Sequence, residues 1–401
     1  MEIKPLNILF LTCRFPFPLI GGDRIKPYHL LRYLSKHHSV TLVCLYQGLD
    51  TTIKEYTKEI ESFGITVVPI RLSLFSSFVS ILTSFFRKIP LEVLYYTQPS
   101  FKKKVDSLLD SSTYDLAIAF FLRTAEYIRK KNIKKILIAE DCRLVYQQRS
   151  VESSTSMLQK AIRIWETNKL AYYEKDVVND FDCTTFVTNE DILFVKNQNP
   201  NAKYALLSNG FDTKKFTFIP FSSIRKNALF VGKLDVWANE MMVRYIVETI
   251  MPKIRQHFPS FSVTIVGGNP KKSLLSYLEQ FPFVTVHSNV SDVVPYLHSH
   301  FVFLHPHRGA TGIQNKIIEA MATGIPIITT NSGVQGIAVQ HKEHILISAS
   351  VETMSDDILD LLQNPSQAEL MVLSARSAIE NEHKWESIFA SFETIITSVL
   401  Q

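Results

Sequence analysis

A short segment in the last third of the chain pairs a cation with a carboxylate behind a glycine turn. Lys316 and Glu319 are three residues apart, so they share one face of a helix that should begin just after Gly309 and Gly312. The first backbone N–H groups of such a helix have no partner within the helix, and the helix dipole attracts anions to this end. A diphosphate at the helix start and sugar hydroxyls at the carboxylate would therefore share one site.

The elements around this segment place it at the edge of a sheet. Apolar runs at 301–304 and 325–329 flank the helix, so the segment predicts a strand, a glycine turn, a helix and a second strand. Open α/β sheets bind ligands at the carboxyl ends of their strands, which is where His307 and Arg308 fall. Both are candidates for the same site, or for exposed loop residues without a role. An ordinary crossover whose glycines only cap turns would show the same local pattern.

Composition indicates two globular domains. The 401 residues are 46% hydrophobic and 20% charged, which gives each of two domains its own core and argues against long disorder. The net charge of +5 does not require a nucleic-acid partner, and it permits attraction to an anionic membrane surface. Four cysteines lie far apart in the sequence, which favours reduced, buried thiols in the cytoplasm over a zinc site.

Strand-like runs alternate with helical patterns along the whole chain. This alternation predicts a doubly wound parallel sheet in residues 1–213 and a second one in residues 227–383, with a final helix at 384–401 that packs back on the first domain. The absence of Gly-x-Gly-x-x-Gly after the first strand argues against dinucleotide binding. The strand-like runs are 7–12, 40–45, 65–70, 116–120, 135–139, 184–187 and 204–207, then 228–232, 263–267, 284–286, 301–304 and 325–329.

Five motifs follow one another in the order and spacing of a known family. They are Gly21-Gly22, Ser208-Asn-Gly-Phe-Asp212, Val231-Gly-Lys-Leu234, Val266-Gly-Gly268 and Glu319-Ala-Met-Ala-Thr-Gly-Ile-Pro326. With them the chain resembles family 4 of the retaining GT-B glycosyltransferases (glycosyl transferases group 1), over nearly its whole length. The stretch Gly312-Ile-Gln-Asn-Lys316 is similar to that of a subgroup of bacterial sugar transferases. The resemblance implies an α/β GT-B fold, in which two Rossmann-like domains face a central cleft.

The resemblance also implies the donor and the residues that bind it. A nucleoside-diphosphate-sugar, UDP- or GDP-linked, would be the donor substrate, with no metal and no other cofactor. Lys233 and Lys316 would neutralise the departing diphosphate while Glu319 binds hydroxyls, although Lys233 also fits a solvated loop lysine. Asp141 is the candidate acceptor-side carboxylate, with a capping or salt-bridge role equally open. The expected donor-binding residues are Gly21, Gly22, Gly232, Lys233, Arg308, Gly309, Thr311, Gly312, Ile313, Gln314, Asn315, Lys316 and Glu319.

The chain departs from the family at several positions. Thr311 stands eight residues before Glu319, where the family usually has a second acid, and 236–239 lacks the family's second cation, for which Lys316 or Arg308 would compensate. Asp180-Phe-Asp182 matches the metal-binding Asp-x-Asp of the other large glycosyltransferase fold. We discount it, because it precedes a strand of the first domain, far in the chain from the diphosphate cluster.

One uncharged segment in the first domain has two interpretations. Residues 72–86 are fifteen residues between Arg71 and Arg87, too short to span a bilayer comfortably. At helical spacing they have a serine side and an opposite apolar face, which would lie on a membrane or pack within the domain. The apolar face consists of Leu74, Phe75, Phe78, Val79, Leu82, Phe85 and Phe86.

These observations predict a retaining, metal-independent glycosyltransferase of the hexosyltransferase type. It would move a sugar from a nucleoside-diphosphate-sugar to a glycan or lipid-linked glycan acceptor, and we expect it to act in bacterial surface polysaccharide synthesis. We expect a cytoplasmic protein, peripheral on the inner face of the cell membrane, with no nucleic-acid partner. The alternatives are a catalytically idle GT-B partner subunit, which Thr311 favours, and a nucleotide-sugar epimerase of the same fold. The epimerase would need paired carboxylates and a His together in the cleft, and the sequence shows no such group there.

Overall fold

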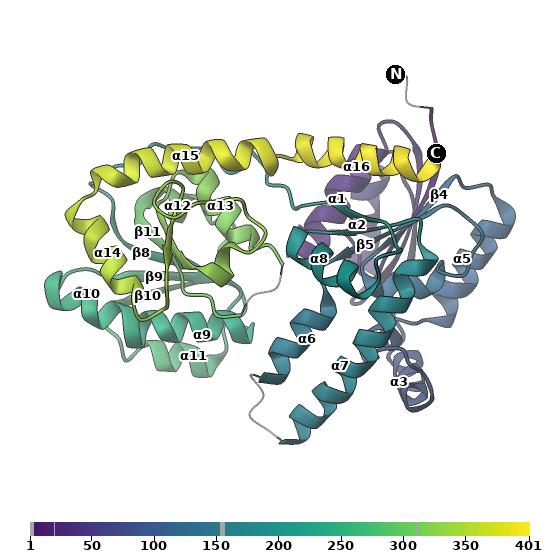
Figure 1. The fold of residues 1–401 in the computed structure, drawn as a ribbon, viewed down its shortest axis with the longest axis horizontal. Coiled ribbons are helices and arrows are strands. Elements are labelled where there is room, and N and C mark those ends of the chain that lie inside the picture. The colour runs from purple at the N-terminus through teal and green to yellow at the C-terminus, as the bar shows by residue number, and fades with distance from the viewer. Residues whose placement is uncertain (1–3, 20, 153–156, 310–311) are drawn as a thin grey trace. The chain divides into compact units, whose positions relative to one another are not determined.

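The computed structural model describes residues 4–19, 21–152, 157–309 and 312–401 (Figure 1). The chain divides into two compact units, Met1–Ser208 with Ile388–Gln401, and Asn209–Ser387. Each unit is built on one parallel sheet with helices between successive strands, which confirms the predicted class of two Rossmann-like α/β domains.

The first unit holds a seven-stranded sheet in the order β3-β2-β1-β4-β5-β6-β7. Its first strand, β1, is an interior strand and is apolar on both faces: Ile8, Leu9, Phe10 and Leu11 are all fully buried, as expected for a strand covered by helices on both sides. The strands are β1 (Asn7–Thr12), β2 (Ser39–Tyr46), β3 (Thr66–Arg71), β4 (Leu116–Phe120), β5 (Lys135–Glu140), β6 (Cys183–Phe186) and β7 (Tyr204–Leu206). The helices are α1 (Gly22–Leu34), α2 (Asp50–Glu61), α3 (Leu74–Leu82), α4 (Leu91–Tyr95), α5 (Pro99–Ser111), α6 (Arg143–Glu152), α7 (Met157–Val177) and α8 (Asn189–Gln198).

The second unit holds a six-stranded sheet in the order β10-β9-β8-β11-β12-β13. Its strands are β8 (Lys226–Val231), β9 (Val263–Gly267), β10 (Val284–Ser288), β11 (His300–His305), β12 (Ile327–Thr330) and β13 (Leu346–Ser348). Its helices are α9 (Trp237–Tyr245), which continues through a π-helical turn into α10 (Met251–His257), and α11 (Lys272–Leu278), α12 (Val294–Ser299), α13 (Asn315–Thr323), α14 (Met354–Gln363) and α15 (Ser366–Glu382). In both sheets the strand order reverses beside the first strand, at β1–β4 and at β8–β11, and such a reversal marks the ligand-binding edge of an open α/β sheet.

The last helix, α16 (Trp385–Leu400), belongs to the first unit from Ile388 onward. The Phe389 ring stacks on Tyr33 of α1 at 4.5 Å between centroids. All four cysteines of the chain are buried and unpaired.

Helix α3 packs through its serine side, not through its apolar side. Ser77 is 1% exposed and donates its hydroxyl hydrogen bond to the Tyr95 carbonyl at 2.6 Å, and the Ser80 hydroxyl donates to the Thr97 carbonyl at 3.2 Å. Phe75 is 77% exposed and Phe78 is 60% exposed. Of the two interpretations of residues 72–86, the one in which the apolar face packs within the domain is therefore excluded for these side chains; the Phe85 side chain lies outside the described part. No helix among the described residues is long and apolar enough to cross a membrane.

Candidate active site

The predicted helix behind the glycine turn is α13, which begins three residues after Gly312. Gly309 and Gly312 both have positive φ, 80° and 70°, which glycine adopts without strain and which turns the chain from β11 into the helix. Gln314 precedes the helix and makes no side-chain capping hydrogen bond. Thr311 lies outside the described residues. Burial of Ile317, Ile318, Ala320, Met321 and Ala322 leaves Lys316 and Glu319 on the half-buried side of the helix.

A buried asparagine orients Lys316. The Lys316 ammonium donates a hydrogen bond to Asn239 Oδ1 at 2.8 Å, and Asn239 Nδ2 donates to the Lys233 carbonyl, also at 2.8 Å. Burial lowers the pKa of Lys316 to about 8, although the nearby Glu319 opposes this shift. The sequence of 236–239 offers no second cation, and it did not reveal that Asn239 positions Lys316. The signal for this role was the position of Asn239 six residues after Lys233.

Glu319 has a free carboxylate. It is half-buried and makes no hydrogen bond or ion pair with any residue that the structure describes. Burial raises the pKa of Glu319 to about 7, while Lys215 and Lys316 act in the opposite direction. An accessible carboxylate without an internal partner is suited to accept hydrogen bonds from the hydroxyls of a ligand.

His305, the last residue of β11, lies beside this pair and is fully buried. Its Nδ1 and the Thr329 hydroxyl are 3.1 Å apart, and within the described part of the chain Nε2 has no hydrogen-bond partner. Burial, the Lys316 ammonium and His307 all lower the pKa of His305, so its imidazole is neutral at physiological pH. Sequence patterns pointed to His307 and not to His305. The signal for His305 was its place at the end of an apolar strand.

Two glycines bring the ends of β8 and β9 into contact. A Cβ at Gly267 would lie 2.0 Å from the Gly232 carbonyl oxygen, so only glycine allows this approach. The Gly232 N–H donates to the Val266 carbonyl at 3.0 Å. Lys233 follows directly and is exposed, and no described residue forms an ion pair with its ammonium. Its charge is therefore available at this strand end.

Arg308 is directed toward other residues of the unit. Its guanidinium lies 4.4 Å from the centroid of the Tyr245 ring, donates to the Tyr245 hydroxyl at 3.3 Å and forms an ion pair with Glu352. The expectation that Arg308 supplies the missing second cation therefore stays a prediction, because binding an anion would compete with Glu352.

The Asn-Gly motif at the start of the second unit supports α13. Asn209 Nδ2 donates a hydrogen bond to Asn315 Oδ1 at 2.9 Å. A Cβ at Gly210 would meet the Trp385 ring at 2.5 Å, so the absence of a side chain there lets the indole pack on the motif. The motif thus fixes the first residue of α13, a role that the sequence did not reveal.

The other candidates belong to the first unit. Gly21, with φ 98°, precedes α1, and Gly22 is its first residue. Asp141 lies 3.5 Å from the Arg143 guanidinium, which also pairs with Glu92 at 3.0 Å. Asp141 therefore has the salt-bridge role that was one of its two interpretations, and an acceptor-side role remains a prediction.

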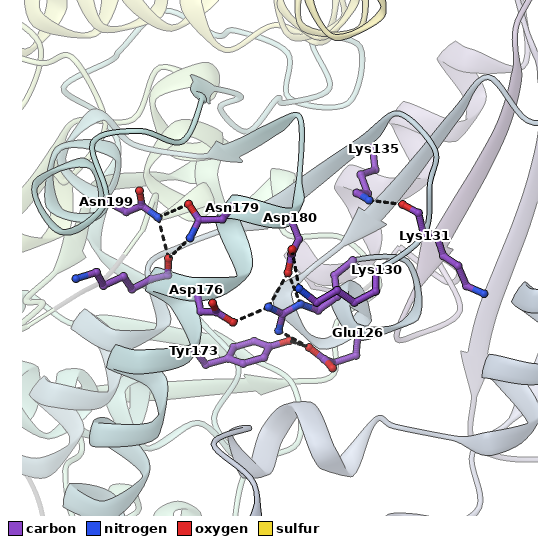
Figure 2. A network of polar contacts seen from close by, with 11 residues as sticks. Glu126, Lys130, Lys131, Lys135, Tyr173, Asp176, Asn179, Asp180 and Asn199 are labelled. Carbon is purple, nitrogen blue, oxygen red and sulfur yellow. Dashed lines mark hydrogen bonds and ion pairs between the residues drawn. The ribbon is translucent and has the colours of Figure 1, made fainter.

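The Asp-x-Asp triplet is held by cations. The Asp180 carboxylate pairs with Lys130 at 2.8 Å and with Arg129 at 2.6 Å, and the Arg129 guanidinium also pairs with Glu126 and Asp176. Figure 2 shows Asp180, Lys130, Glu126 and Asp176 within this network. Asp182 accepts the Lys135 backbone N–H at 2.8 Å. Within the described ranges no three His, Cys, Asp or Glu side chains are grouped so as to hold a metal ion. The triplet thus has a structural role in anchoring the segment after α7.

Comparison with known proteins identifies a domain within the second unit. Residues 225–364 match the family model described as Glycosyl transferases group 1. An uncharacterised 44.6 kDa protein of the cps region of Klebsiella pneumoniae is 22% identical over 400 residues, which are 96% of this chain and 98% of that protein. A GDP-mannose-dependent alpha-(1-6)-phosphatidylinositol monomannoside mannosyltransferase of Mycobacterium tuberculosis is 27% identical over 230 residues, 52% of this chain and 60% of that enzyme.

Solved structures share the fold over the full length. Sucrose-phosphate synthase from Thermosynechococcus elongatus aligns with a TM-score of 0.71 at 16% identity, covering 98% of this chain and 99% of that chain. Anabaena HepE, solved in complex with UDP and glucose, aligns with a TM-score of 0.67 at 13% identity, covering 98% of this chain and all of that chain, 100%. TarM aligns with a TM-score of 0.70 at 12% identity, covering 99% of each chain.

Proposed function

We propose that the chain is a glycosyltransferase that moves a sugar from a nucleoside-diphosphate-sugar to a glycan or lipid-linked glycan acceptor. The match of residues 225–364 to the glycosyl transferases group 1 model and the fold shared with solved glycosyltransferases support this proposal. The transfer would proceed with retention at the anomeric carbon and without a metal ion. The observation that carries the proposal is the pair on α13: an ammonium oriented by Asn239 and an unpartnered carboxylate on the same helix face. The cps-region relative supports a role in bacterial surface polysaccharide synthesis.

In this proposal the chemistry depends on charge placed before the donor arrives. Lys316, Lys233 and the uncapped start of α13 bind the diphosphate and stabilise the charge that develops on it as the sugar leaves. Glu319 accepts hydrogen bonds from hydroxyls of the ribose or the sugar and so fixes their orientation. The leaving phosphate takes the acceptor proton in a front-face attack, so no protein base is needed on the donor side.

The test is a donor screen in the presence of EDTA. UDP- and GDP-sugars are added to the purified chain and its melting temperature is recorded; a donor at one hundred times its Kd stabilises the fold by roughly 2.7 kcal/mol. Hydrolysis or transfer of the bound donor then separates an active transferase from an idle partner subunit. Loss of binding in EDTA that manganese restores would contradict the metal-independent mechanism. Failure of every nucleoside diphosphate and nucleotide-sugar to bind would overturn the donor site.

Binding of the diphosphate should depend on pH through Lys316. Because the pKa of Lys316 is about 8, its ammonium loses its proton between roughly pH 7 and 9. The terminal phosphate of UDP, with a pKa of about 6, is already ionised throughout this range. We expect the affinity for UDP to fall as pH rises above 8, by up to about tenfold per pH unit. Calorimetry from pH 7 to 9.5 measures this slope.

Two variants test whether Lys316 causes this pH dependence of UDP binding. Lys316→Met should bind UDP weakly and with little dependence on pH, whereas Lys272→Met, which removes an exposed lysine of the same unit, should keep the wild-type profile. An unchanged pH profile in Lys316→Met would move the cation that binds the phosphate elsewhere.

We further propose that α3 rests on the inner face of the cell membrane and that the lipid-linked acceptor is met there. Its exposed face carries Leu74, Phe75, Phe78, Val79 and Leu82, followed by Phe86, which is 93% exposed. Arg71, Arg87 and Lys88 flank this face, so apolar insertion and attraction to anionic lipids act together. Lys169 of α7 donates to the Ser84 hydroxyl at 2.5 Å, which fixes the segment after α3 on the unit.

Replacing Phe75 and Phe78 by serine should release the protein from vesicles that contain anionic lipid. Both rings are exposed, so each change should alter the free energy of unfolding by only about 0.5 kcal/mol or less. Vesicle co-sedimentation and the melting temperature measure the two effects. The double variant Leu370→Ser, Leu373→Ser removes exposed apolar side chains from α15 as a matched control. Undiminished co-sedimentation of the phenylalanine variant would refute the membrane contact.

A further inference from the structure

We propose that the first unit holds an acceptor subsite for a sugar that carries an anionic group, a carboxylate or a phosphate. The inference rests on the proposed transferase function and specifies the class of its acceptor. The subsite is a cavity of about 270 Å³ at the carboxyl ends of β1 and β2, lined among others by Arg14, Arg24, Phe17, Tyr46, Tyr56 and Tyr96. Pockets for drug-sized ligands typically measure roughly 300–1,000 Å³, so this one suits about a single sugar residue.

The charged side chains that line this cavity are both cations. The Arg14 guanidinium pairs with Asp23 at 2.6 Å and lies 3.5 Å from the Tyr96 hydroxyl. Arg24, in the first turn of α1, is half-buried, and its guanidinium forms no hydrogen bond or ion pair with the residues described. A guanidinium without a carboxylate partner in a partly apolar wall favours an anionic ligand, which it can bind through two parallel hydrogen bonds.

Aromatic rings line the cavity beside the two arginines. Tyr56 packs edge-on against Phe17, with 5.1 Å between centroids, and its hydroxyl has no hydrogen-bond partner among the described residues. The Arg123 guanidinium lies 5.2 Å from the centroid of the Tyr96 ring and holds that ring in place. Rigid rings with polar tips suit the apolar face and the hydroxyls of a sugar. Rings and a free guanidinium together point to an acidic or phosphorylated sugar rather than a neutral one.

The position of the cavity agrees with an acceptor role. Open α/β sheets bind their ligands at the carboxyl ends of the strands, and this cavity lies at that edge of the first sheet. Leu72, another lining residue, directly precedes Ser73, the N-cap of α3. An acceptor whose lipid lies in the bilayer beside the α3 face would thus present its first sugar close to this cavity.

The experiment measures binding of three small probes to the full chain by saturation-transfer NMR and calorimetry. Methyl glucuronide carries a carboxylate, glucose 1-phosphate carries a phosphate, and methyl glucoside carries neither. We expect at least one anionic probe to bind ten or more times more tightly than methyl glucoside, and the anion that binds identifies the source of the charge. Equal binding of the neutral glucoside, or no binding of either anionic probe, overturns the inference.

Variants then test whether the anionic probe binds in this cavity. Arg24→Gln should weaken the anionic probe tenfold or more and leave UDP affinity unchanged, while Arg32→Gln, which removes an exposed charge from the same helix, should change neither. Tyr56→Ala, which removes a ring from the wall, serves as a second variant if Arg24→Gln does not fold. Unchanged binding of the anionic probe in the folded variant overturns the inference. If UDP itself fails to bind the wild-type chain, the proposed donor function fails instead, so the two failures are distinguishable.

Discussion

Glu319→Gln should lower sugar transfer at subsaturating donor by roughly ten- to a hundredfold while the protein stays folded. The variant keeps the shape of the side chain and loses the charge that strengthens its hydrogen bonds to hydroxyls, a contribution of about 1.5–3 kcal/mol. No internal partner is lost, because Glu319 forms no hydrogen bond or ion pair within the described part of the chain. Initial rates at donor concentrations below KM measure the loss.

Stability provides an independent readout of the same substitution. The folded pKa of Glu319, about 7, lies above its value in an unfolded chain, so the ionised carboxylate destabilises the fold as pH rises past the unfolded pKa, and this cost is complete above pH 7. Glu319→Gln should therefore melt at a higher temperature than the wild type at pH 8, and the difference should shrink toward pH 5. Glu279→Gln, at an exposed position of the same unit, should affect neither rate nor melting temperature. Wild-type turnover in Glu319→Gln would remove this residue from the site.

The fold could be read largely from apolar runs. Residues 7–12 were predicted as a strand and form β1, because a parallel strand buried on both faces is almost wholly apolar. The edge strand β13 escaped prediction, since a strand of three residues is too short to show a period. For residues 72–86 the helical period was correct, but a period cannot tell which face packs. The serine side packs because its hydroxyls donate to the Tyr95 and Thr97 carbonyls, which the sequence does not place nearby.

In the candidate site, too, local features could be predicted from the sequence and long-range contacts could not. Lys316 and Glu319 share a helix face through local spacing alone, so the sequence sufficed to pair them. The contacts that orient the helix are not local: Asn239 and Lys316 are 77 residues apart, and Asn209 and Asn315 are 106 residues apart. Only the sheet order brings such residues together, and a single sequence does not encode that order in any local pattern.

Lys26→Met should give the largest loss of stability in the first unit, about 3–5 kcal/mol. The Lys26 ammonium, 2% exposed, donates to Glu140 Oε1 and to the Leu207 carbonyl, both at 2.6 Å. Removing the cation leaves a buried carboxylate without its partner, which costs far more than the net contribution of the pair. The pair also connects α1, which follows Gly21, to the residue before Asp141, so its loss should loosen both. Native-state hydrogen exchange of the β5 amides measures the change within this unit.

The double variant Lys26→Met, Glu140→Gln decides whether the unpaired charge is the cause. Removing both charges should recover much of the stability, because an ion pair buried in a protein is often replaceable by neutral side chains at little net cost. The two single changes should therefore not add, and the coupling between them should be of the order of 1–3 kcal/mol. Glu140 has a positive φ of 72°, a conformation that the surrounding packing must maintain. Because Glu and Gln have the same backbone strain in this conformation, Glu140→Gln changes the charge and leaves the strain as it is. If the losses of the two single variants simply add in the double variant, packing of the Lys26 side chain, rather than its charge, holds α1 to the sheet.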